Sequence, residues 1–298
     1  MKIKKFKAKG TFTALVTPFK RNRQIDFLAF ENLIRFQINK GITGVAINST
    51  TGEAPTLSES EKLELISRAV NIADGKIPII AGTGSNDTNK TIELTLKSRE
   101  LGASAALIVS PYYNKPMQAH IYNHYKEISE AVDLPIIMYN VPGRTGSNIT
   151  AATQLKIASD CRNVVASKEA SGDMNQILDV IRNKPAGFEV LSGDDSLTLS
   201  MIAAGGSGVV SVITNYLPKE MSDMVKLALA GKFANARKIH NRIFELMNVN
   251  FIESNPVPAK TAMAVIGMIK DYVRLPLQPS TADSRKIIRA ALKRAAII

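Results

Sequence analysis

The amino-acid sequence predicts an α/β fold in which strand and helix alternate eight times to close a (β/α)8 TIM barrel, followed by a C-terminal helical appendix. Eight short apolar or β-branched runs recur along the chain, and amphipathic helical segments separate most of them. Continuous apolar runs of this kind are typical of a parallel sheet that is buried on both faces. The runs cover residues 11–16, 44–48, 77–81, 105–109, 135–139, 163–168, 188–191 and 208–212.

The segments between the runs carry the signals that start and stop helices. Polar residues that can accept hydrogen bonds from free backbone N–H groups stand before the segments, and glycines stand after some of them. The predicted starts are Asp26, Ser58 with Glu61 as a capping box, Thr88, Thr150 and Asp173, and the predicted ends are Gly41 and Gly102.

An open, doubly wound sheet is the alternative for alternating strands and helices. That fold calls for a dinucleotide or phosphate fingerprint after its first strand, and residues 17–20 contain neither. From about residue 217 onward only helical periodicity is present, broken by four prolines. We therefore expect a barrel over residues 1–216, which carries the active site, and a helical domain over residues 217–298.

Composition excludes several classes of protein. With 298 residues, 45% of them hydrophobic, the chain can bury a large core. No run approaches the eighteen or so apolar residues of a membrane span, and the basic residues 1–10 lack the apolar region of a secretory signal. The single cysteine, Cys161, suits a reducing compartment. We expect an unexported cytoplasmic protein with no membrane partner.

The formal net charge of +12 raises the question of a nucleic-acid partner. The Lys and Arg residues are scattered over predicted helix faces, and the chain has no Trp and no Arg-rich tract. We therefore expect a solvated basic surface and no nucleic-acid partner.

The run at 163–168 ends on a lone lysine, Lys168, which is the central candidate for chemistry. A lysine in water is the free base in only about one molecule in a thousand at neutral pH. Burial disfavours the ammonium form, which is how enzymes obtain Schiff-base nucleophiles. Taken alone, the stretch also fits a lysine that marks the strand end and extends to water.

Polar residues that follow the other strands favour the interpretation of Lys168 as a nucleophile. Active sites of (β/α)8 barrels lie at the C-terminal ends of the strands, where Tyr139, Thr50 and Arg144 are all expected. A phenol or hydroxyl beside Lys168 can carry the proton transfers of carbinolamine chemistry, and Arg144 offers a bidentate fork to a carboxylate. Each residue alone has an ordinary structural explanation, so the prediction rests on their convergence.

Patterns for metals and cofactors are weak. His120 and His124 are four residues apart, as zinc ligands can be, but no third ligand accompanies them. Asp194 and Asp195 are expected to cap the helix that follows them and not to bind Mg²⁺. Neither glycine cluster, at 82–84 or at 205–208, has the spacing or position of a nucleotide-binding loop. We expect no metal and no cofactor.

Seven motifs extend over the chain from about Gly10 to its C-terminus: TTGE, GTGSN, PYYNKP, YNVPGRTG, KEASGD, SGDD and GGSGVVSV. In this order and spacing the sequence resembles the dihydrodipicolinate synthase and N-acetylneuraminate lyase superfamily. The resemblance implies a class I aldolase-type lyase without metal or cofactor. Pyruvate would form a Schiff base with Lys168 and attack L-aspartate 4-semialdehyde, giving 4-hydroxy-tetrahydrodipicolinate for lysine and diaminopimelate biosynthesis.

The resemblance also implies roles for individual residues and an assembly. Tyr139 would donate and accept protons, with Thr50 and a Tyr113 from the neighbouring subunit completing the relay, while Thr51 and the backbone at Val210 hold pyruvate and Arg144 binds the semialdehyde carboxylate. Members are usually homotetramers built as dimers of dimers. An N-acetylneuraminate lyase-like or other pyruvate-dependent aldolase, and a catalytically silent barrel, are the alternatives.

Two departures from the family pattern stand out. Ser167 replaces an aliphatic residue, but as the neighbour of Lys168 on a strand it is expected to face the other way. Lys62 and Lys90 stand where lysine-inhibited members have a histidine and a glutamate, although Asn86 and Tyr112 of that effector site are retained. Two extra cations in the effector site predict weak or absent feedback by lysine.

Overall fold

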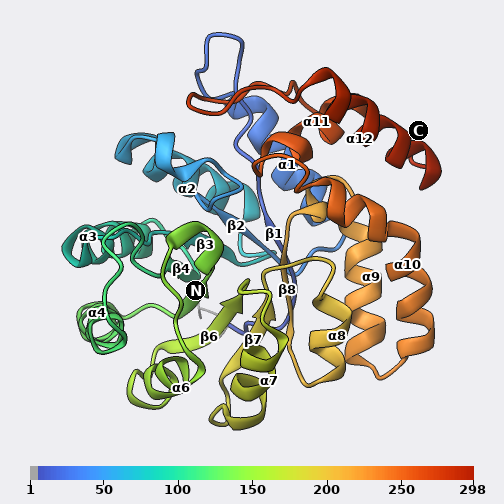
Figure 1. Ribbon diagram of the computed structural model, residues 1–298. Helices are drawn as coiled ribbons and strands as arrows, with labels where there is room; N and C mark the ends of the chain where they lie inside the picture. The colour runs from blue at the N-terminus through green and yellow to red at the C-terminus, as the bar shows by residue number, and fades with distance from the viewer. Residues whose placement is uncertain (1–5) are drawn as a thin grey trace.

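Eight parallel strands pair in sequence order and close into a barrel through the pairing of β1 with β8. A computed structural model describes residues 6–298, so the first five residues of the predicted barrel range lie outside the described part. Helices surround the strands (Figure 1), which confirms the predicted (β/α)8 barrel and excludes the open sheet. The strands are β1 Gly10–Ala14, β2 Gly44–Ile47, β3 Ile79–Gly82, β4 Ala105–Val109, β5 Ile136–Asn140, β6 Val164–Glu169, β7 Glu189–Ser192 and β8 Gly208–Ser211.

Each strand lies within one or two residues of its predicted run. The differences fall at the ends, where burial and hydrogen-bonded pairing do not stop at the same residue. Leu15 and Val16, for example, are buried although β1 ends at Ala14. Apolar runs therefore predict which segments form strands of the barrel, but they predict the end residues of each strand less well.

The helices begin largely where the sequence predicts. Side chains of Asp26, Thr150 and Asp173 cap their helices, and Ser58 forms the capping box with Glu61. The third helix is capped by Asp87, one residue before the predicted start. The helices are α1 Phe27–Asn39, α2 Glu59–Ala73, α3 Thr88–Glu100, α4 Gln118–Ala131, α5 Pro142–Thr145, α6 Ala151–Asp160, α7 Met174–Asn183, α8 Thr198–Ala203, α9 Pro218–Leu229, α10 Phe233–Val249, α11 Val257–Val265 and α12 Ala282–Arg294, with 3₁₀ turns η1 Ala54–Thr56 and η2 Ile213–Asn215.

Alternate side chains of the strands divide the core into an inner and an outer layer. Phe12, Leu107, Ile137 and Leu191 belong to a cluster inside the barrel, and all are almost completely buried. Their strand neighbours point outward and pack against the helices. In the described part of the chain, no helix combines the length and the apolar character needed to cross a membrane.

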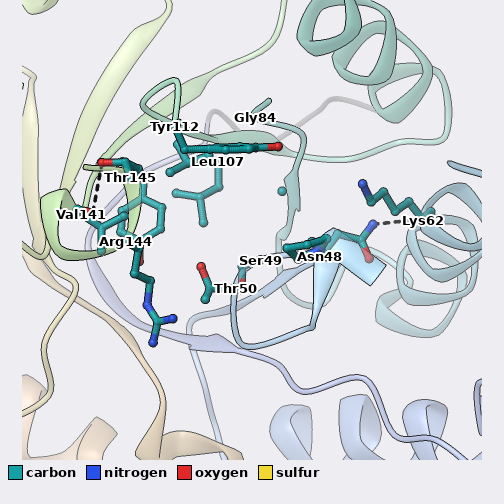
Figure 2. Close-up of a pocket in the computed structure, with 15 residues that line it drawn as sticks. Asn48, Ser49, Thr50, Lys62, Gly84, Leu107, Tyr112, Val141, Arg144 and Thr145 are labelled. Atoms are coloured by element: carbon teal, nitrogen blue, oxygen red, sulfur yellow. Dashed lines mark hydrogen bonds between the residues drawn. The ribbon is translucent and has the colours of Figure 1, made fainter. Parts of the chain in front are cut away.

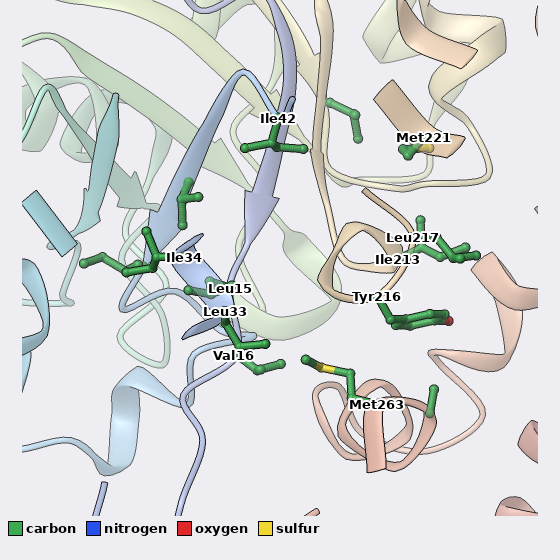
Figure 3. Packing of buried hydrophobic residues seen from close by; sticks show 14 of the residues in the cluster. Leu15, Val16, Leu33, Ile34, Ile42, Ile213, Tyr216, Leu217, Met221 and Met263 are labelled. Carbon is green, nitrogen blue, oxygen red and sulfur yellow. The ribbon is translucent and has the colours of Figure 1, made fainter. Parts of the chain in front are cut away.

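The C-terminal helices share one hydrophobic cluster with the first half of the barrel. Helix α9 packs against β1 and β8, and α10 packs against α9 and α12. Figure 3 shows Leu15 and Val16 near Met263 of α11 and Tyr216, with Leu217 beyond. The predicted helical appendix is thus present, while the boundary between a domain at 1–216 and one at 217–298 stays a prediction.

Replacement of Gly208 by alanine should prevent correct closure of the barrel. Gly208 has φ +144°, and a Cβ there would lie 1.9 Å from the carbonyl oxygen of Gly10 on β1. We expect Gly208→Ala to lower the free energy of unfolding by at least about 3 kcal/mol, measured by urea denaturation.

The control for that experiment is Gly231→Ala, since Gly231 also has positive φ, +73°, but no atom lies within 4 Å of the added Cβ. It should cost only about 1 kcal/mol. Equal losses for the two variants would contradict the steric argument at Gly208.

Candidate active site

A cavity of about 430 Å³ opens at the C-terminal ends of the strands, and Lys168 of β6 is one of its walls. The Lys168 side chain is only 4% exposed. The lining residues come from the C-terminal ends of β5 and β6, from the segments that follow β2, β5, β6, β7 and β8, and from the segment between α10 and α11: Thr50, Thr51, Tyr139, Val141, Gly143, Arg144, Lys168, Ala170, Gly193, Asp194, Val212, Phe251 and Asn255. Four of the seven site residues predicted from the sequence, Thr50, Tyr139, Thr51 and Arg144, thus share a cavity with Lys168.

Lys168 and Tyr139 are direct neighbours across the β5–β6 pair. The Lys168 Nζ lies 4.1 Å from the centre of the Tyr139 ring, and the Tyr139 side chain is likewise buried. The β ladder fixes both backbones, so the amine and the aromatic ring are held together without a flexible loop. A phenol in this position is suited to proton transfer at a carbon attached to the Lys168 nitrogen.

A second cavity, of about 280 Å³, lies beside the first and shares Thr50, Tyr139, Val141 and Arg144 with it. Lys62 of α2 and Tyr112 also line it, and Figure 2 shows Lys62 beside Asn48 and Tyr112 above Leu107. Burial lowers the pKa of Lys62, an effect that the nearby Glu59 opposes. The two cavities meet at Thr50 and Tyr139.

A residue from the C-terminal part of the chain, Asn255, holds the side chain of Thr51 by a hydrogen bond. The Thr51 side chain is buried, and its Oγ1 accepts a hydrogen bond of 2.9 Å from Nδ2 of Asn255. Asn255 and Phe251 lie between α10 and α11, about two hundred residues from Thr51 in sequence. Sequence reasoning missed both residues, because no periodicity or motif marks them and only Pro256 signals a break.

Arg144 lies in the short helix α5, at the edge of both cavities. It is exposed, and its guanidinium makes no ion pair with any residue in the described range 6–298. A carboxylate that enters from solvent would therefore meet an available fork of donors.

The structure does not bring Val210 or Tyr113 to the cavity of its own chain. Val210 is buried in the barrel interior, and Val212, two residues further on, lines the cavity instead. Tyr113 is 88% exposed, with φ +73°, and lines neither cavity.

Outward-facing neighbours of Lys168 anchor the end of β6. Ser167 donates to Oε1 of Gln154 on α6 at 2.7 Å, so it faces away from the cavity as predicted. Glu169 accepts hydrogen bonds from Asn140 at 2.6 Å and Gln154 at 2.9 Å. Burial raises the pKa of Glu169, and these hydrogen bonds oppose the shift. This polar layer fixes the register that turns Lys168 inward.

The prediction that Asp194 and Asp195 cap the next helix is wrong. Helix α8 has Leu197 at its cap position and no side-chain cap. Asp195 instead accepts hydrogen bonds from the backbone N–H groups of Val212 at 3.1 Å and Ile213 at 2.8 Å, just after β8. The free N–H groups after β8 take the Asp195 carboxylate, and Asp195 stands two positions before the cap position of α8, Leu197.

The two histidines of α4 have separate environments. His124 is buried, and its Nδ1 lies 2.9 Å from Oγ1 of Thr88, while His120 is exposed. Burial lowers the pKa of His124 to about 4, so it is neutral at physiological pH. Within residues 6–298 no group of three or more His, Cys, Asp or Glu residues could hold a metal ion.

Comparison with known proteins identifies the family. The model of the dihydrodipicolinate synthetase family matches residues 7–295. The chain belongs to this family. The 4-hydroxy-tetrahydrodipicolinate synthase of Thermotoga neapolitana is 44% identical over 293 residues, which cover 97% of this chain and 99% of the relative. The synthase of Koribacter versatilis is 49% identical over 283 residues, 94% of this chain and 93% of the relative.

A solved structure of the dihydrodipicolinate synthetase family also superposes closely. The chloride-inhibited dihydrodipicolinate synthase from Acinetobacter baumannii, complexed with pyruvate, has a TM-score of 0.95 and 42% identity, over 97% of this chain and 99% of that one. The family resemblance predicted from the motifs is therefore confirmed, and so is the prediction of an enzyme.

Ionisation of Asp195 should destabilise the folded enzyme. Burial raises the pKa of Asp195 from 3.8 to about 6, so between these pH values the folded state binds more protons than the unfolded state. The free energy of unfolding should therefore fall as pH rises from 3.8 to about 6 through this group. Asp195→Asn lacks the titration and should show a shallower fall over the same window, measured by urea denaturation at several pH values. Parallel pH profiles for the two proteins would contradict the assignment.

Proposed function

We propose that this enzyme condenses pyruvate with L-aspartate 4-semialdehyde through a Schiff base on Lys168 and releases 4-hydroxy-tetrahydrodipicolinate. The observation that carries the proposal is a buried lysine amine 4.1 Å from a buried tyrosine ring, at the mouth of a (β/α)8 barrel. The names of the two relatives and the pyruvate complex of a third protein support the same reaction.

The proposed reaction begins with attack of the Lys168 amine on the pyruvate ketone. The carbinolamine loses water to give an iminium, which loses a methyl proton and becomes an enamine. The enamine carbon forms a bond to the aldehyde carbon of the semialdehyde. The amino group of that substrate then attacks the imine carbon, which closes the ring and frees Lys168. Each step moves a proton, and Tyr139 is the group placed to donate and accept it.

Both substrates carry a carboxylate, and the site offers two places to bind one. Thr51 lines the same cavity as Lys168, and we assign its hydroxyl to the pyruvate carboxylate. The backbone at Val210, which the family resemblance implies as a second contact, lies outside the cavity wall, where Val212 stands instead. Arg144 stands exposed at the outer edge, where the semialdehyde arrives, and its fork of donors suits that carboxylate. A short substrate that bears a charge fits this arrangement better than a polyhydroxylated sugar, which favours the synthase reaction over the lyase alternative.

We further propose that a second copy of the chain completes the relay, within a homotetramer of two dimers. Tyr113 points to solvent in its own chain, while the smaller cavity beside Thr50 and Tyr139 has space for a phenol. A phenol from a neighbouring copy that entered there would reach Thr50 and link Tyr139 to bulk solvent. The cytoplasm is the compartment that we propose, because the only cysteine is a free, buried thiol.

Trapping with sodium borohydride should place one pyruvyl group on Lys168. Wild-type protein is incubated with pyruvate and borohydride, and intact mass and peptide mapping report the adduct. Lys168→Ala should give no adduct, and Tyr139→Phe should form it about 10² to 10⁴ times more slowly, because the proton carrier is lost while the amine remains.

Thermal unfolding of each variant is the control, since both should stay folded. An adduct on another lysine, or no adduct on folded wild-type protein, would contradict the Schiff base at Lys168 and favour a catalytically silent barrel. A coupled assay with L-aspartate 4-semialdehyde then separates the synthase reaction from other pyruvate-dependent aldolases.

Free lysine should inhibit this enzyme weakly or not at all. Lys62 and Tyr112 both line the smaller cavity, and Lys90 lies exposed in the first turn of α3. An arriving lysine would place its ammonium groups near two like charges. Initial rates with up to millimolar lysine should therefore change little, and inhibition at sub-millimolar lysine would contradict the proposal.

The matched variant carries Lys62→His and Lys90→Glu, the residue types that the family resemblance assigns to inhibited members. It should gain inhibition by lysine while the uninhibited rate stays close to wild type. A variant as insensitive as wild type would show that other residues decide the response.

A further inference from the structure

The loop between β2 and η1, residues 48–53, is fastened to the C-terminal part of the chain by a buried ion pair. Nζ of Lys260 lies 2.5 Å from Oε1 of Glu53, and the two side chains are 0% and 1% exposed. The second carboxylate oxygen of Glu53 accepts the backbone N–H of Arg274 at 3.0 Å, and Lys260 also donates to the carbonyl of Tyr272 at 2.9 Å. Every polar atom of this pair therefore has a partner on a segment about two hundred residues away in sequence.

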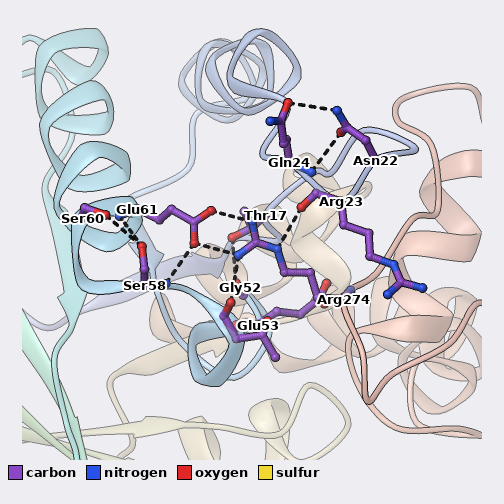
Figure 4. Close-up of polar contacts among 11 residues, drawn as sticks. Thr17, Asn22, Arg23, Gln24, Gly52, Glu53, Ser58, Ser60, Glu61 and Arg274 are labelled. Atoms are coloured by element: carbon purple, nitrogen blue, oxygen red, sulfur yellow. Dashed lines mark hydrogen bonds and ion pairs between the residues drawn. The ribbon is translucent and has the colours of Figure 1, made fainter.

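The Arg274 side chain extends the attachment to the start of α2. Its guanidinium donates to both carboxylate oxygens of Glu61, at 2.7 and 2.5 Å, and to the carbonyl of Thr56 at 2.8 Å. Figure 4 shows Arg274 lying between Glu53 and Glu61, with Gly52 and Thr17 beside them. The loop is thus held on both sides by residues that follow the barrel.

The loop itself has a strained conformation that the contacts maintain. Glu53 has φ +56°, in the left-handed region, which is unfavourable for a residue with a side chain. The carbonyl of Gly52 accepts a hydrogen bond of 2.7 Å from Thr17, and Thr51 accepts its bond from Asn255. Thr51 is thus one of the fixed points, Thr50 directly precedes it, and both residues line the cavity of Lys168.

Stability alone does not account for the buried pair. Burying two charges costs free energy of desolvation, and apolar residues of similar volume often serve stability as well or better. Burial lowers the pKa of Lys260 to about 8 even though Glu53 opposes the shift, which reflects that cost. A pair with directional hydrogen bonds does offer what an apolar contact lacks, a fixed geometry for the loop.

We propose that Glu53 and Lys260 are positioning residues for the reaction at Lys168, and that they act by fixing Thr50 and Thr51 in the cavity wall. The proposal rests on the proposed function. Neither residue lines the cavity, so their effect passes through the loop.

Thr51 shows how the loop position controls chemistry. Because Asn255 donates to Oγ1 of Thr51, the hydroxyl hydrogen of Thr51 is free to be donated to a ligand in the cavity. A pyruvate carboxylate held by this donor is presented to the Lys168 amine in one orientation. Displacement of the loop by about 1 Å would misplace the reacting carbon and lower the rate by about 100-fold.

The test replaces the pair by neutral residues of similar size, Glu53→Gln with Lys260→Met. The control removes an exposed ion pair between α10 and α12, Glu245→Gln with Arg294→Met, whose side chains are 46% and 59% exposed. Steady-state kinetics should show kcat/KM for pyruvate about 100-fold lower in the first variant, with a raised KM, and within twofold of wild type in the control.

A double-mutant cycle with Thr51→Val separates positioning from a general structural effect. If the pair acts through Thr51, its replacement should cost little more once the Thr51 hydroxyl is gone, so the two losses should not add. Additive losses, or a lower fraction of active protein with an unchanged KM for pyruvate, would overturn the proposal.

Two further measurements cover the remaining outcomes. If the neutral pair does not fold, Glu53→Asp keeps the charge but shortens the side chain, and the same rise in KM is expected of it; wild-type constants would reject the proposal. Borohydride trapping of wild-type protein tests the proposed function separately. An untrapped wild type disproves the Schiff base, whereas a trapped wild type with unaffected pair variants disproves only the positioning.

Discussion

Closure of the sheet by the pairing of β1 with β8 is the constraint on which the rest of the structure depends. All eight strands are parallel, so closure brings the ends of all of them to one rim, and residues as distant as Thr50 and Lys168 become neighbours. The close approach of Gly10 and Gly208 permits this pairing. Chemistry at the rim then needs only short loops, because the sheet has already set the separation and direction of each strand end.

Two layers of contacts around β6 give Lys168 its position. On the inner side Tyr139 covers the amine, and on the outer side Ser167 and Glu169 bind amide groups of α6 and β5. Alternation along a strand makes this division automatic, since neighbouring residues face opposite ways. The smaller cavity adjoins the same site, because Thr50 and Tyr139 line both cavities.

The sequence predicts the barrel well because local rules and the global fold agree there. Apolar runs and helix caps such as Ser58 with Glu61 are short-range signals that predict the strands and helices. Because active sites of such barrels lie at the C-terminal strand ends, the same strands predict a site that contains Lys168, Tyr139 and Thr50. Sequence reasoning failed where a side chain forms its hydrogen bonds with residues that are distant in the sequence. Asp195 bonds to N–H groups after β8 instead of capping α8, and Asn255 reaches Thr51 from two hundred residues away. No local pattern encodes such contacts.

The wall that Phe251 and Asn255 contribute to the cavity has a consequence for synthesis on the ribosome. The last strand ends at Ser211, and Asn255 follows 44 residues later, since 255 minus 211 is 44. At translation rates of 5–20 residues per second, roughly 2 to 9 seconds separate the two. During that interval a nascent chain has every strand of its barrel but an unfinished pocket. The order of synthesis therefore adds this part of the pocket wall only after the last strand of the barrel has been made.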